Sequence, residues 1–124
     1  MASTLQLRVH DHEVAVRVAG LDGARSPVVC LHSSGLSGSQ WRRLSKQLSR
    51  LGHPVFAPDL LGYGLTDAWK GHARFETSMD LDLVRALSAT VSGPFHCVGH
   101  SYGGRLALAL ALDQPDAVGS WAAC

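Results

Sequence analysis

Residues 95–104 read Phe-His-Cys-Val-Gly-His-Ser-Tyr-Gly-Gly. The short apolar run that opens this stretch predicts a buried strand, and the glycine-rich turn after it leads into a predicted helix. Within the turn, Gly99, Ser101 and Gly103 form the pattern G-x-S-x-G. Between a strand and a helix, this pattern predicts a sharp turn that holds the serine hydroxyl clear of the backbone. The competing interpretation is an ordinary glycine-rich turn in which Ser101 only caps the helix.

The segments on either side of this turn alternate between strand patterns and helix patterns. Continuous apolar runs predict strands that are buried on both faces, whereas apolar residues spaced three and four apart predict amphipathic helices. The predicted strands cover residues 28–31, 55–57, 95–98 and 118–124, and the predicted helices cover 41–51, 77–92 and 106–112.

Two earlier runs, residues 5–9 and 14–18, alternate apolar with polar residues and are separated by the polar turn His10–Glu13. This arrangement predicts an antiparallel hairpin. Strands that alternate with helices after a hairpin predict an α/β fold, with a mostly parallel twisted sheet and helices on both of its faces.

The three predicted helices carry more detailed expectations. Trp41 and the three leucines that follow it at helical spacing should form one apolar stripe facing the sheet. Thr77 or Ser78 should cap the second helix. Residues 106–112 alternate leucine with alanine, have no polar face and contain only strong helix formers. They predict a fully buried helix.

Composition excludes several classes of protein. The 124 residues are 46% apolar and 17% charged, so the chain can bury a core and is not a disordered tail. A formal net charge of +1 argues against a nucleic-acid binder. Cys30, Cys97 and Cys124 predict reduced thiols rather than a disulfide framework.

No basic segment followed by an apolar stretch opens the chain. The sequence therefore predicts no signal peptide, no membrane span and a cytoplasmic location.

Two loops at the ends of predicted strands could serve the same site as Ser101. Residues 31–38, LHSSGLSG, could turn backbone N–H groups toward an oxygen that gains charge, although a flexible loop is the simpler alternative. His32 in this loop is interpreted as a hydrogen-bonded structural histidine rather than a general base. In residues 59–66, DLLGYGLT, Asp59 is interpreted as pinning its loop by accepting backbone hydrogen bonds.

Together, these segments resemble the α/β-hydrolase family. The matching motifs are H-x-x-G after the third predicted strand, D-x-x-G-x-G-x-T after the fourth and G-H-S-x-G-G after the fifth. The resemblance covers essentially the whole chain, with the motif region at residues 28–124. It implies that residues 1–124 are the N-terminal part of a single α/β-hydrolase domain, which ends within the sixth strand. It also implies that Ser101 is the nucleophile and that the backbone N–H groups of Ser34 and Tyr102 form the oxyanion hole.

The function that this resemblance implies is a serine hydrolase acting on an ester-like or other acyl substrate. A small-molecule acyl substrate is the expected partner, and no cofactor, metal, nucleic acid or membrane is expected. Ser101 would attack the carbonyl, and water would then release the acyl group. The same turn also serves lyases, cofactor-free haloperoxidases and acyltransferases. A truncated module without catalysis is the remaining alternative.

The rest of a catalytic triad is not found in the sequence. In this family an acid and then a histidine follow the serine along the chain. After Ser101, the acids are Asp113 and Asp116, beyond a predicted helix of about ten residues and roughly 15 Å in length. No histidine follows Ser101. Because family members commonly reach about 250 residues, the sequence is expected to be a fragment that is inactive alone and leaves its last strand as an unpaired edge.

Overall fold

The computed structural model describes residues 2–71 and 74–124, so predictions that involve Met1 or His72 lie outside the described residues. The strands are β1 (Ala2–Val9), β2 (His12–Ala19), β3 (Val28–Leu31), β4 (Val55–Pro58), β5 (Phe95–Gly99) and β6 (Val118–Ala123). The helices are the 3-10 helix η1 (Gly38–Trp41) and the α-helices α1 (Arg42–Arg50), α2 (Thr77–Thr90) and α3 (Tyr102–Asp113).

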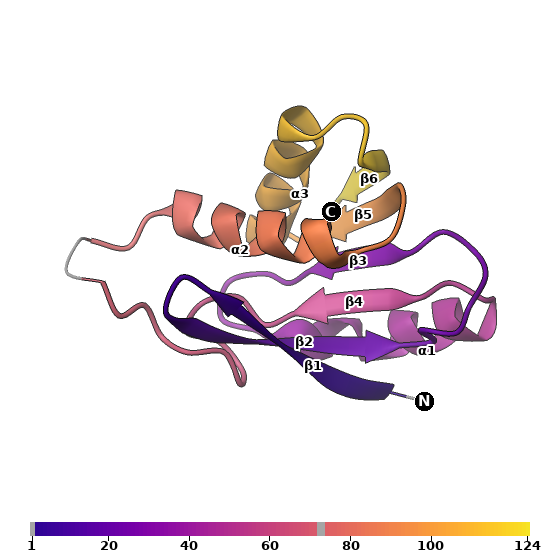
Figure 1. Cartoon of the computed structure of the whole chain (residues 1–124), viewed down its shortest axis with the longest axis horizontal. Helices are drawn as coiled ribbons and strands as arrows, with labels where there is room; N and C mark the ends of the chain where they lie inside the picture. The colour runs from indigo at the N-terminus through magenta and orange to yellow at the C-terminus, as the bar shows by residue number, and fades with distance from the viewer. Residues whose placement is uncertain (1, 72–73) are drawn as a thin grey trace.

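The strands form one sheet in the order β1-β2-β4-β3-β5-β6 (Figure 1). β1 pairs antiparallel with β2, and β2 pairs antiparallel with β4, whereas β4, β3, β5 and β6 run parallel to one another. All four residues of β3 are buried, as expected for a central strand covered on both faces. The predicted mostly parallel sheet with an N-terminal antiparallel hairpin is therefore confirmed.

The hairpin turn is shorter than the sequence predicts. His12 pairs with Val9 and already belongs to β2, so that the turn has two residues rather than four. The His12 side chain is only 4% exposed, because its ring stacks on Trp69 with a centroid distance of 5.1 Å. The backbone N–H of Lys70 donates to its Nε2 atom at 3.0 Å. A packed histidine therefore extends the strand where polarity alone predicts a turn.

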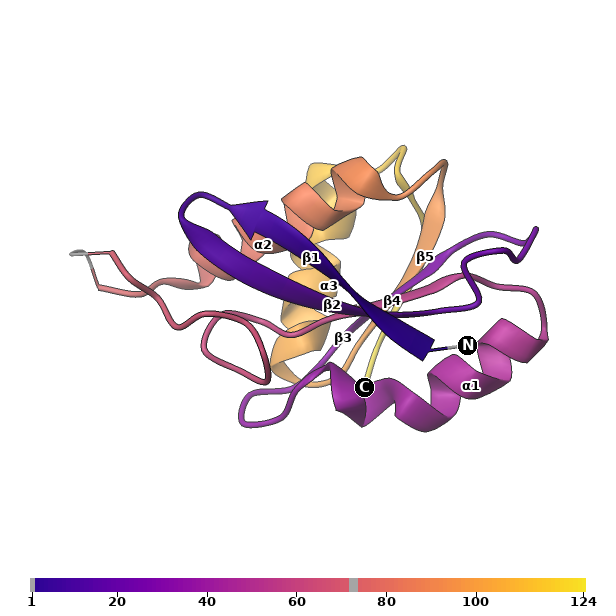
Figure 2. The same ribbon diagram turned by 60° about the horizontal axis from the view of Figure 1, so that its bottom comes forward.

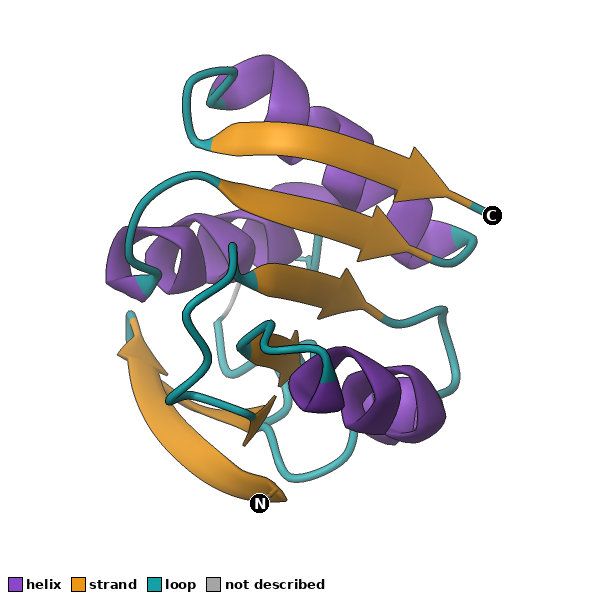
Figure 3. Cartoon of the chain, turned by 90° about the vertical axis from the view of Figure 1, so that its right-hand side faces the viewer, coloured by secondary structure: helices purple, strands orange, loops and turns teal. Residues whose placement is uncertain are grey.

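Helices cover both faces of the sheet, as predicted. α2 and α3 lie on one face and α1 lies on the other (Figures 2 and 3). The larger core cluster includes Cys97, and the smaller one, under α1, includes Cys30. In the β3–β5 register, Cys30 lies opposite Val98 rather than opposite Cys97, so the two thiols point to opposite faces of the sheet. Both thiols are free. Burial raises the pKa of each to about 12, which keeps both thiols protonated.

Two helices are less buried than expected. In α3, Leu108 and Leu112 are 40% and 75% exposed, so the expected fully buried helix is wrong. In the stripe predicted for residues 41–51, Trp41 of η1 is buried, whereas Leu44 of α1 and Leu51, directly after α1, are exposed. The reason is the same: within residues 2–71 and 74–124, no further element covers the outer side of either helix. No helix in the described part of the chain has the length and apolar character needed to cross a membrane.

α2 begins one residue earlier than the capping rule predicts. Glu76 is its N-cap residue and its backbone N–H contacts the Sδ atom of Met79 at 3.3 Å. Thr77 is therefore the first helical residue rather than the cap. The first turn carries Asp80, which is 1% exposed and faces the loop after β4 and the start of α3.

Candidate active site

The turn between β5 and α3 places Ser101 in a strained backbone conformation. Its φ and ψ angles are 55° and −113°, outside the regions that non-glycine residues ordinarily occupy. The Ser101 N–H donates to the Cys124 carbonyl oxygen at 2.7 Å, and the Gly103 N–H donates to the His100 carbonyl oxygen at 3.0 Å. The Ser101 side chain is exposed, and its hydroxyl makes no hydrogen bond to the residues that the structure describes. The turn thus presents an unengaged hydroxyl at the start of α3.

Glycines on both sides of Ser101 allow the chain to make this turn. A Cβ atom at Gly99 would lie 2.6 Å from the backbone nitrogen of Gly104, and one at Gly103 would lie 2.7 Å from the His32 carbonyl oxygen. Both distances are far below van der Waals contact. The close approach predicted from G-x-S-x-G is therefore present, and it joins the turn to the end of β3 as well as to itself.

Ser34 and Tyr102 share one cavity next to this turn. The cavity has a volume of about 280 Å³. It is lined by Ser34, Leu61, Tyr63, Trp69, Phe75, Thr77, Asp80 and Tyr102. Neither the Ser34 N–H nor the Tyr102 N–H has a hydrogen-bond partner among the described residues. Ser34, from the loop after β3, and Tyr102, the residue after Ser101, therefore both line this cavity.

Asp80 holds Tyr102 at the wall of this cavity, a role that sequence reasoning missed. Its carboxylate accepts a hydrogen bond from the Tyr102 hydroxyl at 2.6 Å and one from the Leu61 N–H at 3.1 Å. Burial raises the pKa of the Asp80 carboxyl, and burial together with this hydrogen bond raises the pKa of the Tyr102 phenol. No local pattern around Asp80 distinguishes it from a surface acid in the first turn of a helix.

His32 connects the loop after β3 to the loop after β4. Its Nε2 atom accepts the Leu60 N–H at 2.9 Å, so the ring carries its hydrogen on Nδ1 and donates it to the Ser33 carbonyl oxygen at 2.7 Å. The ring is fully buried, and burial lowers its pKa. With both nitrogens engaged, His32 makes the contacts of a structural histidine, as the sequence predicts.

His32 makes stability depend on pH. The folded-state pKa lies below the ordinary value of 6.5, so between these two values the unfolded chain binds more protons than the folded chain. We therefore expect the free energy of unfolding to fall as the pH decreases through 6.5, and to fall less in His32→Asn. Urea unfolding at a series of pH values measures this, with His10→Asn in the exposed hairpin turn as the matched control. Equal pH slopes in the unsubstituted chain and His32→Asn would contradict the prediction.

Asp59 anchors the loops around the site, in agreement with its predicted role. One carboxylate oxygen accepts the Gly38 N–H at 2.7 Å, and the other accepts the Leu65 N–H at 3.0 Å. Arg17 donates to both oxygens, at 3.0 and 3.2 Å. The carboxylate is fully buried and the Arg17 side chain is 33% exposed. Asp59 thereby fixes η1 and the loop after β4 to the hairpin.

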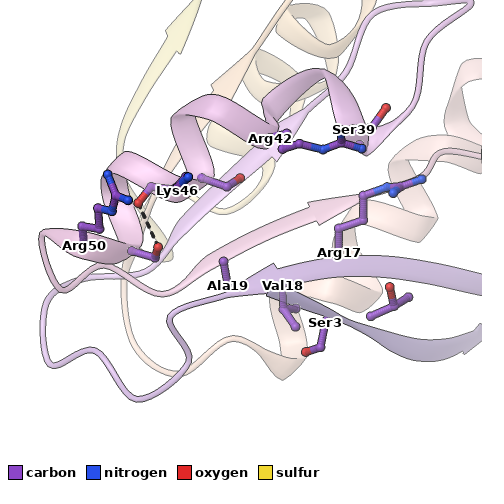
Figure 4. Close-up of a pocket in the computed structure, with 12 residues that line it drawn as sticks. Ser3, Arg17, Val18, Ala19, Ser39, Arg42, Lys46 and Arg50 are labelled. Carbon is purple, nitrogen blue, oxygen red and sulfur yellow. Dashed lines mark hydrogen bonds between the residues drawn. The ribbon is translucent and has the colours of Figure 1, made fainter. Parts of the chain in front are cut away.

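A larger cavity lies away from Ser101. It has a volume of about 590 Å³ and lies between the hairpin and α1 (Figure 4). Arg42, Lys46 and Arg50 of α1 line it together with Arg17 and several hydroxyl groups. None of its lining residues belongs to the serine turn. The smaller cavity is therefore the one associated with Ser101.

The acids that follow Ser101 in sequence are remote from it. Asp113 ends α3, whose 12 residues span about 18 Å. Both of its carboxylate oxygens accept hydrogen bonds from Arg85 at 2.9 Å, and this guanidinium lowers the pKa of the carboxyl. Among the described residues, no group of three or more His, Cys, Asp or Glu side chains could hold a metal ion.

Fold and site together define a class of α/β protein in which a strained strand–turn–helix exposes a serine. The family model described as alpha/beta hydrolase fold matches residues 26–124. The chain belongs to this family.

Similar proteins agree with this assignment. The chain is 36% identical over 99 residues to 2-hydroxy-6-oxo-2,4-heptadienoate hydrolase of Pseudomonas putida, covering 77% of this chain and 36% of that protein. It is 35% identical over 91 residues to lipase LipV of Mycobacterium tuberculosis, covering 73% of this chain and 33% of the lipase. A thioesterase domain from the curacin biosynthetic pathway superposes with a TM-score of 0.91 at 23% identity, covering 98% of this chain and 43% of that one. The chain thus spans about a third of the length of these two curated relatives.

Proposed function

We propose that this chain carries the nucleophile and oxyanion hole of a serine hydrolase that transfers an acyl group to water. The observation that carries the proposal is the strained conformation of Ser101, with φ of 55°, at a turn between strand and helix. A non-glycine residue persists in such a conformation only where the surrounding structure enforces it, and such residues cluster at functional sites. The alternative role as a helix cap has less support, because the Ser101 side chain makes no capping hydrogen bond.

In the proposed reaction, the Ser101 Oγ atom attacks the carbonyl carbon of the substrate while a base removes its proton. The negative charge that develops on the carbonyl oxygen is stabilised by the N–H groups of Ser34 and Tyr102. Collapse of the tetrahedral intermediate expels the leaving group and forms an acyl-enzyme, which water hydrolyses. The base and its orienting acid lie outside these 124 residues in our proposal.

The cavity beside Ser34 and Tyr102 is the proposed acyl-binding pocket. Its volume of about 280 Å³ suits a small acyl group, and its walls include the aromatic rings of Tyr63, Trp69 and Phe75. We place the protein in the cytoplasm, which is supported by three cysteines that are all free.

A fluorophosphonate probe tests this proposal in the chain as it exists, with imidazole supplied as the external base. The Ser101 oxygen would attack phosphorus, fluoride would leave, and imidazole would take the serine proton. We expect Ser101 to be modified faster than any other serine of the chain, with a rate that increases with imidazole concentration, as measured by peptide mass spectrometry. The other exposed serines, such as Ser39 and Ser92, are internal controls, and Ser101→Ala should remove the fast phase. Modification spread evenly over the exposed serines would refute the proposal.

A further inference from the structure

Gln40 bridges the two loops that carry the proposed catalytic groups. Its Oε1 atom accepts the Ser33 N–H at 3.0 Å, and its Nε2 atom lies 2.6 Å from the Nδ1 atom of His100. Ser33 directly precedes Ser34, and His100 directly precedes Ser101. One side chain therefore spans from the loop after β3 to the serine turn.

The hydrogen positions in this bridge follow from its chemistry. A backbone N–H can only donate, so the amide atom that faces Ser33 must be the oxygen of Gln40. The NH₂ group of Gln40 then faces His100, and because this group can only donate, His100 Nδ1 must accept. The neutral His100 ring consequently carries its hydrogen on Nε2. The bridge thus sets both the direction and the tautomer of the His100 ring.

The backbone that carries Gln40 is itself fixed. Gln40 lies in η1, whose first residue, Gly38, donates its N–H to the buried Asp59 carboxylate at 2.7 Å. The next residue, Trp41, is 8% exposed and packs in the smaller core cluster. Because its backbone is fixed in this way, the Gln40 side chain can hold the two loops in a defined relation to each other.

We infer that Gln40 is a positioning residue that locks the Ser34 N–H and the Ser101 hydroxyl into one geometry. This inference rests on the proposed function, because the distance between these two groups affects catalysis only if one is the oxyanion donor and the other the nucleophile. Rate depends strongly on such geometry, since a displacement of about 1 Å can reduce the rate by about a hundredfold. The pairing of β3 with β5 aligns only the two strands. Gln40 connects the two loops that follow these strands.

Two substitutions separate this role from simple packing. Gln40→Met keeps the length of the side chain and removes both hydrogen bonds. Gln40→Glu keeps the acceptor for the Ser33 N–H but places a carboxylate oxygen opposite His100. Because a carboxylate can only accept, the His100 ring must then donate, and its hydrogen moves to Nδ1. The bridge is thereby restored with one bond reversed. Gln47→Met, on the exposed side of α1, is the matched control.

The experiment combines nitrogen NMR of His100, amide exchange of Ser33 and the imidazole-assisted phosphonylation rate of Ser101. In the unsubstituted chain we expect the Nε2–H tautomer and a protected Ser33 amide. Gln40→Met should give mixed tautomers, a faster-exchanging Ser33 amide and phosphonylation slower by about tenfold. Gln40→Glu should show the Nδ1–H tautomer and a phosphonylation rate within about threefold of the original, because its bridge is intact. Thermal unfolding of each variant shows that it is folded under these conditions.

Three outcomes would overturn the inference. The first is an Nδ1–H tautomer in the unsubstituted chain, which would mean that the bridge does not exist in solution. The second is an unchanged phosphonylation rate in Gln40→Met despite loss of the tautomer preference. The third is an equal loss of rate in Gln40→Glu and Gln40→Met. If Ser101 does not react in any form, the proposed function fails, and the Gln40 bridge is then judged by the tautomer and the Ser33 amide alone.

Discussion

Gly103→Ala is expected to lower the free energy of unfolding by about 3 kcal/mol, the upper end of ordinary overpacking effects. The added Cβ atom would overlap the Leu31 carbonyl group and would lie 2.7 Å from the His32 carbonyl oxygen. Both are backbone atoms at the end of β3, which is held between β4 and β5 and cannot move without disturbing the sheet. The helix itself would gain slightly from alanine, so any loss must come from the clash. Urea unfolding followed by circular dichroism measures the change.

Gly119→Ala provides the matched control for this substitution. Gly119 lies in β6, and a Cβ atom there would have no neighbour nearer than 3.8 Å. We expect its free energy of unfolding to stay within about 1 kcal/mol of the original. A Gly103→Ala chain as stable as Gly119→Ala would show that the serine turn is not packed against β3 as described. The turn would then lack the support that our functional proposal requires.

Asp59→Asn should lower the free energy of unfolding by about 3 kcal/mol. The substituted amide would keep one acceptor oxygen but would turn an NH₂ group toward other donors. Arg17 and the Leu65 N–H both face the position of the second oxygen, at 3.2 and 3.0 Å. The substitution therefore removes the charge of a buried carboxylate from its ion pair with the partly exposed Arg17 and leaves a backbone donor without its acceptor. Chemical denaturation at low and high salt checks the prediction, because screening affects a partly buried pair less than an exposed one.

The control for Asp59→Asn is Glu13→Gln, which breaks the exposed ion pair between Arg8 and Glu13. Their side chains are 62% and 50% exposed, compared with 33% and 0% for Arg17 and Asp59. An exposed pair contributes about 1 kcal/mol or less, so Glu13→Gln should have a small effect that decreases with salt. Similar effects of the two substitutions would contradict the anchoring role of Asp59.

Much of the fold could be predicted from sequence because its signals are local. Alternation at residues 5–9 and 14–18 and continuous apolar runs at 28–31 and 95–98 depend only on which faces of a strand are buried. The exposure of α1 and α3 could not be predicted in this way. Leu112 belongs to an apolar run, yet it is 75% exposed, since burial depends on what lies beside the helix in space.

The candidate site also contains some residues that the sequence predicts and others that only the tertiary structure reveals. Ser101, Ser34 and Tyr102 could be predicted as site residues because the short motifs that contain them resemble those of the α/β-hydrolase family. Gln40 and Asp80 were missed because their partners are far away in the sequence. Gln40 contacts a residue 60 positions away, and Asp80 contacts Tyr102, which is 22 positions away. Hydrogen bonds between segments so distant in sequence leave no local pattern.

The amino-acid sequence by itself therefore determined the order of strands and helices, the family and the residue expected to be the nucleophile. The order follows from side-chain periodicity, whereas the family and the expected nucleophile follow from the resemblance of three loop motifs to the α/β-hydrolase family. Only the tertiary structure decided which loops meet at that turn, that Ser34 and Tyr102 line one cavity, and that Gln40 joins Ser33 to His100. The physical reason is that a hydrogen bond requires two groups within about 3 Å, and the packing of the sheet and helices brings them to that distance.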